Sequence, residues 1–201
     1  MTTPPGTVSE KLGPGAFVAV VGPSGAGKDT LLDLARVRLA DREECWFPRR
    51  AITRGADASG EDHEAVSGDT FKYRLAEGAY ALTWDAHGLS YGIPISVDTA
   101  IAGGSIVLCN LSRSAIPEVL DRYRRVVVVH VTAPVNVLAE RLAQRGREDP
   151  ADIQARLARA TFDLPEAREV VVIDNVGAPE EAAERIVDLA LSLVPSEERR
   201  T

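Results

Sequence analysis

Short apolar runs recur along the chain and predict the strands of a buried sheet. Four of them are rich in valine and isoleucine and show no polar alternation: Phe17–Val21, Ser105–Cys109, Val126–Val131 and Val170–Ile173. Strands that are covered on both faces have this pattern, whereas strands with one wet face alternate. A fifth, weaker strand is predicted around Arg50–Thr53. We therefore expect a mainly parallel sheet with both faces buried.

Helical patterns separate these strands. Apolar residues three and four positions apart follow the first strand, from Leu31 to Leu39, and three further helices are predicted over Pro134–Gln144, Asp149–Phe162 and Pro179–Leu193. Asp149 followed by Pro150 is typical of a helix N-cap and first turn. Strands that alternate with helices predict an α/β fold of three layers, with helices on both sides of the sheet.

The length of 201 residues suits one domain, which we place at residues 16–195. Residues 1–15 are polar and proline-containing and are expected to form a flexible segment, and residues 196–201 a charged tail. Residues 54–93 are rich in glycine, acidic residues and aromatics, which predicts an insert folded over the sheet edge. The charged link at residues 145–150 lies between two predicted helices and is expected to form a small lid.

A glycine-rich segment follows the first predicted strand and precedes the first predicted helix. Its glycines let the backbone curl so that successive amides point at phosphate oxygens, and the helix N-terminus adds its positive end. A lysine in it supplies a point charge that reaches the β- and γ-phosphates. A chance glycine-rich turn would lack the flanking strand and helix. We therefore predict an ATP-binding loop made of Gly22, Pro23, Ser24, Gly25, Ala26, Gly27, Lys28, Asp29 and Thr30.

Asp29 stands where the usual form of this loop has a serine or threonine that holds Mg²⁺. Two interpretations stay open. In the first, Asp29 holds the metal through water while Thr30 contacts a phosphate. In the second, Asp29 is a first-turn acid that favours the helix dipole. Mg²⁺ is the expected cofactor in either case, carried by ATP.

Composition and net charge limit the binding partners and the cellular compartment that we expect for this protein. A net charge of −7 opposes binding to nucleic acid or to anionic membranes. The apolar runs are too short to cross a bilayer, and residues 1–15 lack the apolar core of a signal peptide. Cys45 and Cys109 are isolated beside apolar neighbours, which is typical of thiols in a reducing compartment. We expect a cytoplasmic protein, monomeric or homodimeric, that acts on small molecules.

Further motifs accompany the loop, namely Thr53-Arg54, Gly60-Glu61, Val66-Ser67, Tyr91-Gly92, Arg141-Leu142, Arg145-Gly146 and Arg156-Leu157. Together they resemble the guanylate kinase branch of the nucleoside monophosphate kinases, over roughly residues 16–175. The resemblance implies a P-loop NTPase fold, an insert that binds the acceptor, and lid arginines that close on the phosphates of ATP and acceptor.

The chain differs from guanylate kinases at the positions that contact the guanine base in those enzymes. Guanylate kinases read guanine with a glutamate before an aromatic residue and a serine after Tyr-Gly, and Thr83 and Ile93 stand at those places here. Each unpaired polar group would cost about 1–3 kcal/mol, so specific base recognition is hard to sustain. Two strand-end carboxylates of that branch are replaced by Asn110 and Ser112.

The whole pattern is similar to the ribose 1,5-bisphosphate phosphokinases of bacterial phosphonate utilisation. The motifs that carry this similarity are Gly27–Thr30, Gly60–His63, Ala65–Ser67, Trp84–Leu89, Tyr91–Pro94 and Arg145–Glu148. The resemblance implies that ATP phosphorylates the 1-phosphate of ribose 1,5-bisphosphate. The products would be 5-phospho-α-D-ribose 1-diphosphate and ADP. An acceptor without a base agrees with the missing guanine contacts.

Phosphoryl transfer between phosphates needs positioning and positive charge rather than a strong base. We assign that charge to Lys28 and the lid residues Arg145, Arg147 and Arg156, and we leave Arg141 as a surface residue of its helix. Arg54 and Tyr91 are expected to grip the acceptor phosphate. The other candidate acceptor residues are His63, Thr83, His87 and Asn110, with His87 either contacting the sugar or only satisfying a turn.

Two other functions remain open from the sequence. The first is a guanylate or other nucleoside monophosphate kinase with unusual base contacts, against which Thr83 and Ile93 argue. The second is a catalytically inactive kinase-like module that binds protein. Such a module is expected to lose its phosphate loop, and this chain retains Lys28.

Overall fold

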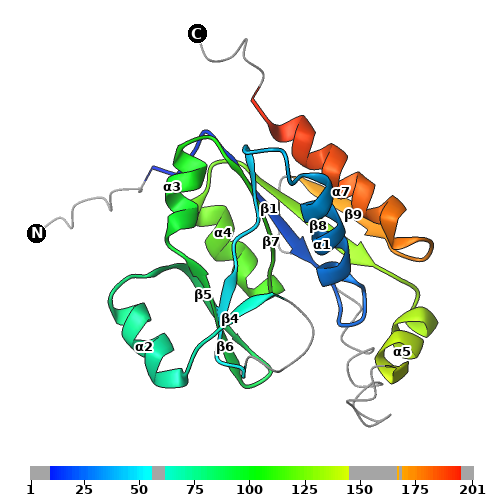
Figure 1. Cartoon of the computed structure of the whole chain (residues 1–201), viewed down its shortest axis with the longest axis horizontal. Helices are drawn as coiled ribbons and strands as arrows, with labels where there is room; N and C mark the ends of the chain where they lie inside the picture. Colours follow the sequence, from blue (N-terminus) through cyan, green and yellow to red (C-terminus); the bar gives the residue numbers. More distant parts are fainter. Residues whose placement is uncertain (1–9, 56–61, 145–166, 168, 196–201) are drawn as a thin grey trace, which may run out of the picture.

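The computed structural model describes residues 10–55, 62–144, 167 and 169–195 (Figure 1). Its centre is a five-stranded, wholly parallel sheet with the order β2-β7-β1-β8-β9. The central strand β1 pairs with β7 and β8 on either side, so the carboxyl ends of these three strands meet at one edge. The strands are β1 (Ala16–Val21), β2 (Cys45–Trp46), β7 (Ile106–Asn110), β8 (Val126–Thr132) and β9 (Val170–Asp174).

Helices cover both faces of this sheet, which confirms the predicted three-layer α/β fold. Figure 1 shows α1 (Lys28–Arg38) beside α7 (Pro179–Leu193), and both pack on the face formed by Val18, Val20 and their neighbours. The helices α3 (Ser96–Ala102) and α4 (Ile116–Arg122) pack on the opposite face. Because every side chain of β1 is buried, its unbroken apolar run is explained by this double cover.

A second, four-stranded sheet lies beside the first, with the order β4-β3-β6-β5. We call it the acceptor sheet. The pair β5–β6 is an antiparallel hairpin whose turn is His87-Gly88, and both residues have positive φ angles, as the tight turns of hairpins require. Its elements are β3 (Arg50–Ile52), β4 (His63–Ala65), β5 (Tyr80–Ala86) and β6 (Leu89–Pro94), with the helix α2 (Gly68–Ala76) between β4 and β5.

The strand predicted at Arg50–Thr53 is present as β3, but it joins the acceptor sheet instead of the parallel sheet. The fifth place in the parallel sheet belongs to β2, which pairs with β7. A strand of two residues is too short to produce a hydrophobic pattern of its own.

The prediction that β9 is fully buried is wrong. Val170 and Val172 are 39% and 49% exposed. The reason is position, because among the described residues β9 pairs only with β8 and lies at the edge of its sheet. An apolar run therefore marks the strand correctly without showing that both of its faces are covered.

Residues 10–15 pack on the domain, where Leu12 forms a bridge with Tyr123 and Gly15 donates to the carbonyl of Ile101. The helix α5 (Val135–Gln144) matches the predicted one to within a residue. The predicted lid at residues 145–150 and the predicted helix over Asp149–Phe162 lie outside the described residues. Within the described ranges, none of the helices is both long enough and apolar enough to cross a bilayer.

Candidate functional site: a phosphate loop facing an aromatic pocket

The glycine-rich loop connects the end of β1 to the start of α1. Gly22 leaves the strand with φ 150°, and Gly27 caps the helix with φ 90° in the left-handed region. A Cβ atom on Gly22 would lie 2.1 Å from the carbonyl oxygen of Val131, which is backbone and cannot move aside. The loop therefore needs glycine at this place both for its conformation and for its close approach to β8.

We expect the substitution Gly22→Ala to lower the free energy of unfolding by about 3 kcal/mol, because it combines a strained φ with a backbone clash. Chemical denaturation of both proteins measures the difference. Gly78→Ala is the matched control, since Gly78 also has a positive φ but has open space where its Cβ would be. That variant should lose only about 1 kcal/mol. Equal losses in the two variants would contradict the close approach at Gly22.

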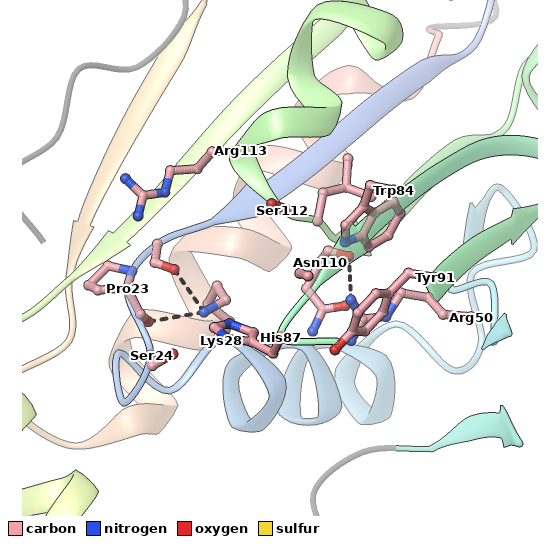
Figure 2. A pocket seen from close by; sticks show the side chains of 13 residues that line it. Pro23, Ser24, Lys28, Arg50, Trp84, His87, Tyr91, Asn110, Ser112 and Arg113 are labelled. Atoms are coloured by element: carbon pink, nitrogen blue, oxygen red, sulfur yellow. Dashed lines mark hydrogen bonds between the residues drawn. The ribbon is translucent and has the colours of Figure 1, made fainter. Parts of the chain in front are cut away.

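Lys28 is the first residue of α1, and its side chain folds back over the loop. Its Nζ donates to the carbonyl oxygens of Gly22 and Pro23 at 2.9 and 3.0 Å. These bonds, dashed in Figure 2, hold the ammonium group against the loop at the start of α1. A polyphosphate in the loop would thus meet backbone donors and a positive charge together.

The loop is held from its other side by Asn175, a buried residue just after β9. Its Nδ2 donates to the carbonyl of Ala26 at 2.8 Å, and a Cβ atom on Gly27 would lie 2.4 Å from that nitrogen. The Nη2 of Arg141 donates in turn to the carbonyl of Asn175 at 2.9 Å. Arg141 is therefore a half-buried residue whose guanidinium is linked to the loop through Asn175, so it is more than a surface residue of its helix.

A cavity of about 250 Å³ opens between the loop and the acceptor sheet (Figure 2). Three elements line it: the phosphate loop, the acceptor sheet, and the carboxyl end of β7. Ligands of open α/β sheets gather at the carboxyl ends of the strands, so the location is the one expected for substrate. The lining residues are, in that order of elements, Gly22, Pro23, Ser24 and Lys28; Arg50, Trp84, Ala86, His87 and Tyr91; and Asn110, Leu111, Ser112 and Arg113.

Two stacked rings form the wall on the acceptor side. Trp84 of β5 and Tyr91 of β6 are paired across the hairpin, with their ring centroids 5.2 Å apart and their planes 5° apart. The guanidinium carbon of Arg50 lies 5.9 Å from the Trp84 ring centroid and 5.6 Å from that of Tyr91. Its Nη1 donates to the carbonyl oxygen of Asn110 at 3.1 Å. Arg50 is thus held in place by two rings and by the end of β7.

Asn110 joins the acceptor side to the loop. Its side-chain amide donates to Oδ1 of Asp29 in the first turn of α1, while its carbonyl accepts from Arg50. Asp29 therefore points toward the carboxyl end of β7, whereas Thr30 is exposed on the helix. This contact shows that Asp29 has a specific partner in addition to its place near the helix N-terminus.

The electrostatic environment is positive at the loop end of the cavity. His130 of β8 reports it: burial lowers the pKa of its imidazole below the ordinary value, and the positive charges of Arg113 and Lys28 lower it further. Asp174 has a smaller, opposing effect. Burial also lowers the pKa of the Arg113 guanidinium. Two partly desolvated cations next to phosphate-binding amides suit an anionic ligand.

The structure brings together part of the residue set that the sequence predicts. Lys28, His87, Tyr91 and Asn110 line one cavity with the first residues of the loop. Arg54, His63 and Thr83 are not among the lining residues: Arg54 is half-buried after β3, His63 is buried at the start of β4, and Thr83 is half-buried in β5. The predicted lid residues lie outside the described residues: Arg145, Arg147 and Arg156.

Sequence reasoning missed Arg50, Arg113 and Asn175. Arg50 sits inside a predicted strand, where an arginine normally indicates a solvated face. Arg113 comes shortly after the end of β7, and that position could have identified it, because ligands collect at such ends. Asn175 acts on a loop that is 149 residues distant from it in sequence, and no local pattern indicates such a contact.

No family model matches the chain. Among curated proteins, it is 45% identical over 173 residues to the ribose 1,5-bisphosphate phosphokinase PhnN of Agrobacterium fabrum, covering 86% of this chain and 94% of that protein. It is also 45% identical over 183 residues to the PhnN protein of Rhizobium etli, which carries the same description, covering 91% of each chain.

Among solved structures, the chain is similar to guanylate kinase from Anaplasma phagocytophilum, with a TM-score of 0.63. That match covers 94% of this chain and 90% of the other at 19% identity, and at this identity it shows the fold alone. The fold is thus that of the guanylate kinase group of P-loop proteins. At 45% identity over nearly the full length of the curated relatives, the chain belongs to the ribose 1,5-bisphosphate phosphokinase family.

Proposed function

We propose that the protein transfers the γ-phosphate of ATP to the 1-phosphate of ribose 1,5-bisphosphate, which gives 5-phospho-α-D-ribose 1-diphosphate and ADP. One observation carries the proposal: the phosphate loop and the acceptor sheet line the same cavity, and the positions at which guanylate kinases read a base do not open onto it. Ile93 is fully buried in the core, and Thr83 is not among the lining residues. Membership of the family supports the same acceptor.

The chemistry requires little of the protein beyond placement and charge. An oxygen of the acceptor 1-phosphate attacks the γ-phosphorus, the bond from that phosphorus to the β,γ-bridging oxygen breaks, and ADP leaves with the electron pair. The attacking oxygen is already anionic, so no proton has to be removed. Lys28 stabilises the charge that develops on the γ-phosphate and the bridging oxygen. Arg113 lines the cavity and would neutralise the acceptor phosphate as it approaches.

Several roles rest on the sequence and are part of the proposal. Arg145 and Arg147 of the lid at residues 145–150, together with Arg156 of the predicted helix that follows, would close on the phosphates, and the insert at residues 54–93 would bind the acceptor. Tyr91, His87 and Asn110 line the cavity and would contact phosphate or sugar directly. Arg54, His63 and Thr83 would contribute only if the acceptor sheet moves toward the loop on binding.

Mg²⁺ is the cofactor we propose, bound together with ATP. The ion prefers oxygen ligands and usually retains several waters, so a single carboxylate beside the loop is an adequate anchor. Asp29 offers that carboxylate at the carboxyl end of β7, and Thr30 follows it on α1. Among the described residues there is no group of three or more metal-binding side chains, which fits a metal held mainly by water and phosphate. When bound, Mg²⁺ would neutralise charge on the β- and γ-phosphates.

The proposal is tested by following ADP release with ribose 1,5-bisphosphate as the acceptor. We expect turnover that requires the acceptor, ATP and Mg²⁺, and that stops when the metal is chelated. Absence of acceptor-dependent ADP release would contradict the proposal, and release without added metal would contradict the cofactor. We further propose that the enzyme works in the cytoplasm as a monomer or homodimer, without nucleic acid or membrane.

A further inference from the structure

We propose that Arg50 is the residue that selects a sugar bisphosphate, because its guanidinium binds the 5-phosphate, the phosphate that does not react. This inference rests on the proposed function and goes beyond it, since it names how the acceptor is recognised and oriented. Arg50 is the first residue of β3 and lines the cavity, where it donates a hydrogen bond to the carbonyl of Asn110 at the end of β7.

The guanidinium is fixed before any ligand arrives. It lies against the rings of Trp84 and Tyr91, both within the 6 Å at which a cation and an aromatic ring attract each other. The hydrogen bond to the Asn110 carbonyl sets the orientation of its plane. A guanidinium is a planar fork that matches the geometry of a phosphate, and a fork that is already oriented loses less entropy on binding.

The cavity has positive charge at two separate places. In Figure 2, Lys28 and Arg113 lie on the side of the loop residue Pro23, whereas Arg50 lies on the other side with Trp84 and Tyr91. A molecule with a phosphate at each end would pair with both. If Arg50 holds the 5-phosphate, the 1-phosphate is left facing Lys28 and the ATP loop. The same contact therefore explains which of the two phosphates accepts the transferred group.

A nucleobase fits this wall poorly. Its stacking surface would be the rings of Trp84 and Tyr91, but Arg50 already lies close to both. A guanidinium that already contacts both rings leaves less of their faces for a base to stack on. The same planar fork matches the geometry of an acceptor phosphate. The pocket thus recognises a second phosphate where a nucleotide kinase would recognise a base.

The test uses two monophosphates, each of which carries one of the two phosphate groups of ribose 1,5-bisphosphate. Ribose 5-phosphate has the group that Arg50 should bind, and ribose 1-phosphate lacks it. Competitive inhibition constants for both are measured in the wild type, in Arg50→Ala and in Arg50→Lys, which keeps the charge but loses the fork. We expect Arg50→Ala to raise the KM for ribose 1,5-bisphosphate and the inhibition constant of ribose 5-phosphate by about 10- to 100-fold each. Arg50→Lys should lie between, and ribose 1-phosphate should inhibit all three alike.

Arg38→Ala is the control, since Arg38 is exposed on α1 and pairs with Glu184. It should leave every constant unchanged. An equal rise for both monophosphates in Arg50→Ala would mean that Arg50 only supports the wall, and would overturn the assignment. Failure of ribose 5-phosphate to bind the wild type in calorimetry would overturn it too. Because calorimetry does not depend on turnover, the assignment of Arg50 can be judged even if ribose 1,5-bisphosphate proves not to be the substrate.

Discussion

Replacing Lys28 with alanine is expected to lower kcat/KM by about 1,000-fold, the loss typical of removing a group that stabilises transition-state charge. Lys28 is held over the loop by the carbonyls of Gly22 and Pro23, so its charge is in position before ATP binds. Such preorganisation is what makes a single charge effective in the transition state. The loss should fall mainly on kcat, because the loop amides still bind the phosphates. Steady-state kinetics with saturating ATP measures it.

Lys72→Ala provides a matched control, because Lys72 is an exposed lysine of α2 that faces solvent instead of the cavity. That variant should keep wild-type activity. The Lys28→Ala protein should unfold at nearly the wild-type temperature, since its lost bonds lie at a partly exposed loop. Activity within a few-fold of wild type in Lys28→Ala would mean that the loop does not hold the transferred phosphate, and the mechanism would be wrong.

The second large effect concerns the acceptor. We expect kcat/KM for ribose 1,5-bisphosphate to exceed that for GMP or AMP by about 1,000-fold or more, since a site that lacks partners for polar groups discriminates strongly against them. Ile93 is wholly buried and offers no hydrogen bond, and Arg50 lies on the aromatic wall. ADP release with the three acceptors at equal concentration gives the ratio.

A preference for GMP over ribose 1,5-bisphosphate would contradict the acceptor that we propose. If GMP were turned over faster than ribose 1,5-bisphosphate, the cavity would have to read a base with groups other than those at positions 83 and 93. The family assignment would then hold without the acceptor that we infer from it. The fold would be unaffected, because the likeness to guanylate kinase concerns architecture alone.

The parts of the fold that were predictable from sequence are those fixed by local pattern. β1, β7 and β8 lie inside the parallel sheet, and each has an apolar run that predicts it, although His130 interrupts the run of β8. The phosphate loop was predictable because its spacing of glycines and lysine follows a strand and opens a helix. The elements that were missed are short or mixed in character, such as β2 with its two residues. The apolar run of β9 predicts a strand but not its exposure, because an edge strand and a central strand can share the same composition.

The site was predictable where a single element supplies it and less so where several meet. Lys28 follows from the loop alone. Arg50 gains its place from the pairing of β3 with β6 and from its bond to Asn110, which is 60 residues away in sequence. Arg113 and Asn175 likewise face the loop only because strands that are distant in sequence are neighbours in the sheet. Tertiary pairing of this kind leaves no local signal.

If two phosphates meet end to end in one cavity, the position of the new phosphate on the product will show it. The protein is incubated with ATP, Mg²⁺ and ribose 1,5-bisphosphate, and the product is analysed by mass spectrometry and ³¹P NMR. We expect a ribose that has gained one phosphate as a diphosphate on carbon 1, with an unchanged monophosphate on carbon 5. A diphosphate on carbon 5, or hydrolysis of ATP with no phosphorylated product, would contradict it.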